Sequence, residues 1–123
     1  MPNRPAAGPR PDIPLPASEF QILLALADGE RHGYAIMQEI ERRSAGAVRL
    51  GPGTLYGSIK RMLAAGLIHE SEERPADGRD DERRRYYRIT TLGRRAATAE
   101  ARRMERLVTA ARAKRLLGRP EPA

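Results

Sequence analysis

The sequence predicts a mainly α-helical fold with a small β component (α+β), followed by a long C-terminal helix. Two observations lead to this prediction. Apolar residues recur at helical spacing in three successive segments and again near the C-terminus. Between them, two short segments with strand character are separated by a run of turn formers. A chain of 123 residues has room for one small domain and little more.

The first two helices are expected at residues 18–28 and at about 33–43. The first has a broad apolar face, made of Phe20, Ile22, Leu23, Leu24, Leu26 and Ala27. Asp28-Gly29 ends it, since glycine tolerates the left-handed conformation that often terminates a helix. The second helix is apolar at Ile36, Met37 and Ile40, and Ser44-Ala45-Gly46 closes it. Residues 48–50 (Val-Arg-Leu) are expected to form a very short strand.

The third helix is expected at residues 52–65. Gly51 stands at the N-cap position and Pro52 at the first helical position, where a missing N–H costs nothing. Gly66 is the expected stop. At 100° per residue, its core-facing side chains are Leu55, Ile59, Met62 and Leu63.

Residues 67–73 and 84–90 are predicted to form an antiparallel hairpin with a long tip. Tyr86 and Tyr87 point to opposite faces of their strand, and Ile89 shares the face of Tyr87, so Tyr87 is the expected buried one. Thr90 or Thr91 can cap the last helix, predicted over residues 92–117.

Three helices followed by a hairpin match the plan of a winged helix-turn-helix domain with a two-stranded wing. The predicted organisation is a disordered proline-rich tail (1–15), the winged domain (16–90), a C-terminal dimerisation helix (91–117) and a second disordered tail (118–123).

The helix at 52–65 presents a face without acidic residues opposite its apolar stripe. Small and basic residues make up this face, and Tyr56 and Ser58 flank it. Such a face suits a helix lying in a DNA major groove, where small side chains permit close approach and cations meet phosphate or guanine. The alternative is an ordinary surface helix. A phosphate-binding loop is a weaker interpretation, because no lysine directly precedes a Ser or Thr. The DNA-contacting residues predicted in this helix are Gly53, Thr54, Tyr56, Ser58, Lys60 and Arg61.

The net charge of +7 favours polyanions, nucleic acid first and an anionic membrane surface second. Without cysteine the chain can form neither disulfides nor thiolate metal sites. His32 and His69 lie far apart without further ligands at metal-binding spacing, and no serine has a recognisable base partner. We therefore expect no enzyme, no metal, no cofactor and no membrane span, and a cytoplasmic location.

Three motifs carry a resemblance to a known family: ILLALADGERHGYAIMQEIE, LGPGTLYGSIKRMLAAGLI and DDERRRYYRITTLGRR. In order and spacing they resemble the PadR-type family of bacterial transcriptional regulators. The resemblance implies a winged helix-turn-helix domain, a C-terminal dimerisation helix and a repressor. It also implies that the GTLY helix enters the major groove, and that Tyr34 of the HGY segment lies near the DNA backbone.

A small-molecule effector stays an open question. Some relatives release DNA on binding phenolic acids or hydrophobic drugs, and large drug cavities in the family use aromatic side chains between subunits. This chain has no tryptophan and one phenylalanine, which argues against such a cavity.

The last helix indicates a homodimer. It would extend roughly 39 Å at about 1.5 Å per residue, longer than a small domain needs to cover itself. A two-fold pairing with a second copy would bury the apolar side chains left over, and a membrane-surface helix is the poorer alternative because aromatic anchors are missing. The predicted dimerisation residues are Met104, Leu107, Val108 and Ala111.

The wing is ambiguous. Arg79 at its tip and Arg84 on its second strand are candidate DNA contacts, yet Asp77 and the acidic run at 80–82 share the loop. A solvated loop with internal ion pairs is an equal alternative. The acidic run also motivates a second hypothesis for the whole chain, a protein-interaction module whose helix-turn-helix is a docking scaffold.

Overall fold

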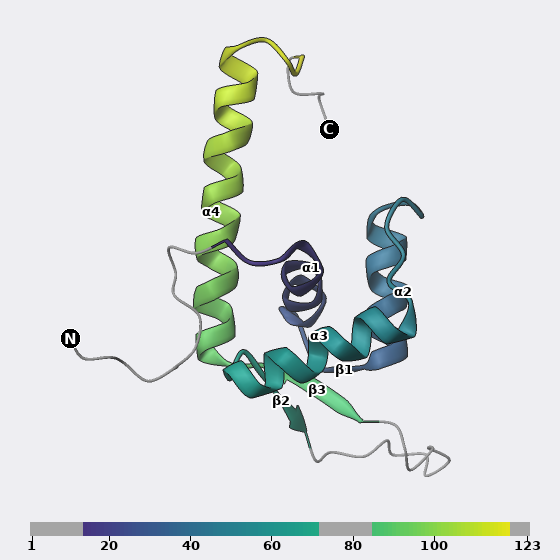
Figure 1. Cartoon of the computed structure of the whole chain (residues 1–123). Helices are drawn as coiled ribbons and strands as arrows, with labels where there is room; N and C mark the ends of the chain where they lie inside the picture. The colour runs from purple at the N-terminus through teal and green to yellow at the C-terminus, as the bar shows by residue number, and fades with distance from the viewer. Residues whose placement is uncertain (1–13, 72–84, 119–123) are drawn as a thin grey trace, which may run out of the picture.

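The computed structural model describes residues 14–71 and 85–118. Figure 1 shows a mainly helical chain with one small sheet, as the sequence predicts. The elements follow in this order: α1 (Ala17–Leu26), β1 (Arg31–His32), α2 (Gly33–Arg43), α3 (Pro52–Ala65), β2 (Ile68–Ser71), β3 (Tyr86–Ile89) and α4 (Thr91–Ala113).

Helix α1 lies at the centre of the domain, in contact with α2, α3, β3 and α4. Its almost continuous apolar sequence explains this position, because a helix apolar on most sides must be covered on most sides. Ile22 and Leu23 are fully buried, and so are Leu55 and Met62 of α3. The core therefore holds α3 by one face and leaves the opposite face free.

The sheet has three antiparallel strands in the order β1–β3–β2. The predicted hairpin is present, with Ile68 paired to Ile89. Tyr87 is the buried tyrosine of β3, 4% exposed, as the alternation predicts. Burial raises the pKa of its phenol, with a smaller contribution from the Glu70 carboxylate, so the hydroxyl stays protonated at neutral pH.

The additional strand lies at Arg31–His32 and not at residues 48–50, so the predicted position is wrong. Strand β1 pairs with the edge of β3 that β2 leaves free, Arg31 opposite Tyr87 and His32 opposite Tyr86. Residues 48–50 form no strand, and the Val48 N–H donates to Ser44 Oγ at 2.9 Å instead.

Local capping signals set most helix ends where the sequence predicts them. Helix α3 begins at Pro52 and stops at Gly66, whose φ of 80° is left-handed. His32 caps α2 by accepting from the Ala35 N–H, and Thr90 caps α4 by accepting from the Gly93 N–H.

Helix α4 ends at Ala113, four residues before its predicted end. The chain turns there because Arg115 has a positive φ of 65°. The Leu116 N–H then donates to the Ala111 carbonyl at 2.9 Å, which satisfies an end carbonyl of the helix.

Several predictions fall on residues outside the described ranges. These predictions concern residues 1–13, residues 72–84 of the wing with Arg79 and Arg84, and residues 119–123. Leu15, assigned above to the tail, packs against the core, and its N–H donates to Glu100 Oε1 at 3.1 Å. The folded part of the chain therefore begins before residue 16.

Candidate nucleic-acid interface

The solvent face of α3 lacks acidic residues, as its sequence shows. Gly53, Thr54 and Lys60 are exposed on this face. Tyr56 is 47% exposed at its flank. Short side chains near the start of the helix let a ligand approach the backbone closely, and the free N–H groups of a helix start favour an anion there. The chemistry of this face suits a polyanion.

Tyr56 also fixes how α2 sits against α3. A Cβ placed on Gly33 would lie 2.2 Å from Tyr56 Oη, so the phenol rests directly on the backbone at the start of α2. While Tyr56 lies in this position, only glycine fits at residue 33. The HGY and GTLY segments are thus two sides of one contact, which sets the position of Tyr34.

Tyr34, 57% exposed, follows this contact on α2. A groove of about 500 Å³ opens here between the start of α2, α3 and the sheet. Lys60 lines it from α3 and Arg85 from beside β3, where Arg85 Nη1 donates to Glu70 Oε2 at 2.9 Å. The groove therefore brings phenols and cations together next to the exposed face of α3.

Ser58 does not belong to the exposed face. It is fully buried, and its Oγ lies 3.1 Å from Ser18 Oγ of α1. The helical position that looks like a flank from sequence is covered by α1, so we leave Ser58 out of the DNA-contacting set.

Arg61 is held by α1. Its Nε donates to Glu19 Oε2 at 3.4 Å and its Nη2 to Ser58 Oγ at 3.2 Å, while 63% of its side chain stays exposed. No sequence pattern predicts Glu19 as the partner of Arg61. Its position in the first turn of an apolar helix gives no sign of a partner 42 residues away.

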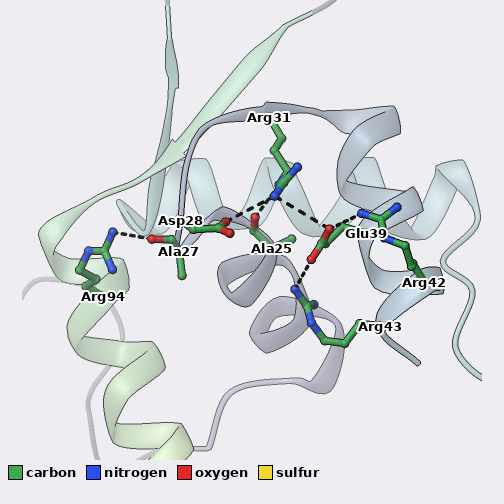
Figure 2. Close-up of polar contacts among 8 residues, drawn as sticks. All are labelled: Ala25, Ala27, Asp28, Arg31, Glu39, Arg42, Arg43 and Arg94. Atoms are coloured by element: carbon green, nitrogen blue, oxygen red, sulfur yellow. Dashed lines mark hydrogen bonds and ion pairs between the residues drawn. The ribbon is translucent and has the colours of Figure 1, made fainter. Parts of the chain in front are cut away.

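The arginines of α2 are paired within the domain, as Figure 2 shows. Glu39 Oε1 accepts from Arg42 at 2.5 Å and Glu39 Oε2 from Arg43 at 2.6 Å. Much of the basic charge on this helix is therefore compensated by an acid of the same helix, whereas α3 carries no acidic residue of its own.

Two other arginines close the end of α1. Arg31 Nε donates to the Ala25 carbonyl and Arg94 Nη2 to the Ala27 carbonyl, each at 2.8 Å (Figure 2). Helix α1 has no basic residue in its own last turn, so β1 and α4 supply the donors that its end carbonyls require. These arginines serve the fold.

Both histidines make contacts with other residues of the domain. His32 caps α2 and meets Tyr86 edge-on at 5.3 Å between ring centroids, and His69 Nε2 accepts from Arg88 Nε at 3.0 Å. Over residues 14–71 and 85–118, no three His, Cys, Asp or Glu side chains gather into a possible metal site.

The sequence model of the Transcriptional regulator PadR-like family matches residues 22–99, which include the second half of α1, all of α2, α3 and the sheet, and the start of α4. The chain belongs to the PadR family. Its members are transcriptional regulators and not enzymes, so the prediction of a non-enzymatic protein is confirmed through the family.

A transcriptional regulator of Mycobacterium tuberculosis is 43% identical to this PadR chain over 91 residues, covering 74% of this chain and 78% of the relative. A PadR family transcription regulator of hypervirulent Clostridium difficile matches in structure with a TM-score of 0.64 and 25% identity, over 84% of this chain and all (100%) of the other. A PadR-like transcriptional regulator of Bacillus cereus matches with a TM-score of 0.66 at 23% identity, over 82% of this chain and 92% of the other. These likenesses confirm the predicted winged-helix fold.

Among the described residues, none of the helices combines the length and apolar character needed to cross a membrane.

Proposed function

We propose that this PadR-family protein is a homodimeric DNA-binding repressor, acting in the cytoplasm, that reads a palindromic operator with α3. The observation that carries the proposal is the acid-free exposed face of α3 with Gly53, Thr54 and Lys60, next to the groove in which Lys60 lies with Tyr34 and Tyr56. An ordinary solvated helix face carries both charge signs.

In the proposed complex each subunit places α3 in a major groove. Gly53 and Thr54 approach base edges at the start of the helix, and Lys60 meets a guanine edge or a phosphate. Tyr34 and Tyr56, at the rim of the groove beside α3, offer hydroxyl donors to the sugar-phosphate backbone. Arg79 and Arg84 of the wing remain proposed contacts of the same backbone.

The dimer is proposed to form through α4. Met104, Leu107 and Val108 are 38%, 64% and 44% exposed, and Ala111 lies beside them on the same face. A second copy related by a two-fold axis would cover this apolar surface and place two α3 helices on one side of a duplex, about 10 bp apart or a small multiple of that.

Selection of bound duplexes from a random library tests the proposal. A palindromic motif is the expected result, and its half-site spacing tests the dimer geometry. Salt-sensitive binding without a motif would mean that the protein binds nucleic acid without sequence specificity. No binding at all would favour the protein-interaction module.

Lys60→Ala should weaken binding to the selected duplex by about 1–3 kcal/mol if Lys60 contacts a base edge. Lys114→Ala, at the exposed end of α4, removes the same charge away from α3 and serves as the control. Equal affinities for Lys60→Ala and Lys114→Ala in a titration at fixed salt would contradict the placement of α3 in the groove.

A further inference from the structure

Helix α3 carries one cation that the domain itself binds. The Glu19 carboxylate of α1 faces Arg61 Nε across 3.4 Å. The two partners differ in environment, since the Arg61 side chain is 63% exposed and that of Glu19 only 11%. A mostly buried carboxylate therefore contacts an exposed cation of the proposed DNA-binding helix.

Glu19 keeps Arg61 in place. Within residues 14–71 and 85–118, no second cationic side chain pairs with the Glu19 carboxylate. Leaving a buried carboxylate without its cation is costly, so Arg61 does not leave it freely. Ser58 adds a second point of attachment, since its buried Oγ accepts from Arg61 Nη2 and lies against Ser18 of α1.

The remaining edge of the guanidinium points along the exposed face. Arg61 Nη1 lies 3.8 Å from the position that a Cβ on Gly57 would take. Arginine holds its five N–H donors in a rigid planar fork, so fixing Nε and Nη2 also fixes the direction of Nη1. A guanidinium held in this way loses little side-chain freedom when it contacts a ligand in the matching position.

We infer that Glu19 is a specificity-determining residue that does not itself touch DNA. It orients Arg61 for one contact and compensates the charge that would otherwise attract any phosphate. The inference rests on the proposed DNA binding. Because non-specific affinity comes from phosphate charge and specific affinity needs defined geometry, Glu19 raises the ratio of specific to non-specific binding.

The test compares Glu19→Gln with the wild type on the selected duplex and on a random-sequence duplex, over a series of salt concentrations. Glutamine keeps the shape of the side chain and removes the charge. Affinity for the random duplex should rise about threefold or more, and the salt dependence should steepen by up to about one counterion, as a freed cation reaches a phosphate. Affinity for the selected duplex should rise less or fall, so the specificity ratio falls.

Glu105→Gln is the matched control, because it changes the net charge equally on an exposed part of α4. It should leave the specificity ratio unchanged. A second control places Glu19→Gln in an Arg61→Gln background, where it should have no further effect on the ratio. An unchanged ratio in Glu19→Gln, an equal fall in Glu105→Gln, or an undiminished effect without Arg61 would each overturn the inference.

Thermal unfolding of the wild type, Glu19→Gln, Arg61→Gln and the variant with both substitutions measures the Glu19–Arg61 contact without DNA. The shifts in Tm should be non-additive, since each single variant already breaks the Glu19–Arg61 pair. Additive shifts in Tm would contradict the hold of Glu19 on Arg61. If the wild type bound no duplex, the proposed function would fail and this role of Glu19 with it, whereas normal wild-type binding with an unchanged ratio in Glu19→Gln would overturn the role of Glu19 alone.

Discussion

One face of α4 lies in two different environments along the length of the helix. Gly93, Ala96 and Glu100 are buried in the N-terminal half, whereas Met104 and Leu107 are exposed in the C-terminal half. At 100° per residue all five fall within about a quarter of the helix circumference. In Figure 1 the C-terminal half of α4 projects away from α1.

The difference separates folding from assembly. Substitutions in the N-terminal half should change the free energy of unfolding of one chain, because α1 and the sheet cover that half. Substitutions in the C-terminal half should change association under the proposed dimer and leave the fold of the single chain almost unaffected. Four measurements can break or sharpen this distinction.

The largest effect is expected at Gly93. A Cβ there would lie 2.1 Å from the Leu67 carbonyl oxygen, a backbone atom that cannot move aside cheaply. Gly93→Ala should lower the free energy of unfolding by about 3 kcal/mol, despite the better helix propensity of alanine. Gly57→Ala in α3 is the control, since its Cβ would meet only the Arg61 side chain at 3.8 Å. Equal stability of the two variants in urea titrations would contradict the close packing of α4.

Leu107→Asp should weaken the proposed dimer by about 2 kcal/mol or more, because it puts a charge into the apolar contact. Thr109→Asp adds the same charge to the other side of the helix and should leave association unchanged. Sedimentation equilibrium measures both. If Leu107→Asp and the wild type associate equally, the C-terminal half of α4 is not the dimer contact.

Thr90→Ala should cost about 1 kcal/mol of unfolding free energy through the lost N-cap. Thr90 Oγ1 accepts from the Gly93 N–H at 2.9 Å, and its hydroxyl donates to the Gly66 carbonyl at 2.6 Å, with the Leu67 carbonyl 3.0 Å away. Thr90→Ser keeps both hydrogen bonds and should recover most of the loss in chemical denaturation. A loss in Thr90→Ser as large as in Thr90→Ala would assign the effect to packing of the methyl group.

The smallest effect is expected at Glu100, where the two halves meet. Hydrogen bonds from Arg103 and from the Leu15 N–H hold the pKa of Glu100 below its ordinary value of 4.5. Ionised Glu100 therefore stabilises the fold above its unfolded pKa, and this contribution is lost as the pH falls through the lower folded pKa. Glu100→Gln should cost about 0.5 kcal/mol at pH 7, the size of a helical ion pair.

The Tm difference between wild type and Glu100→Gln should shrink below pH 4.5. Glu105→Gln, on an exposed position of the same helix, is the control that removes the same charge. A difference that stays constant from pH 7 to acid would show that the carboxylate charge does not stabilise the fold.

At the candidate site, some positions could be predicted from the sequence and others could not. The exposed face of α3 follows from helical spacing, because Gly53, Thr54 and Lys60 stand opposite Leu55 and Ile59 wherever the helix packs. Ser58 could not be placed in this way. It lies at the border of the two faces, and its burial depends on Ser18 of α1 standing against it.

Local signals in the sequence by themselves determined the helices and the hairpin. Gly51-Pro52 marks the start of α3 and Gly66 its end, and Thr90 caps α4, because capping preferences act on the backbone within a few residues. The alternation of Tyr87 and Ile89 likewise determined which side of β3 is buried.

Only the tertiary structure decided which distant groups meet. Strand β1 exists because β3 has a free edge, Arg94 caps a helix that ends 68 residues earlier at Leu26, and Glu19 holds Arg61 across 42 residues. Such partners are set by how the helices pack around α1. A hydrogen bond or ion pair needs two groups within a few ångströms, and spacing along the chain carries no information on that distance until the core has formed.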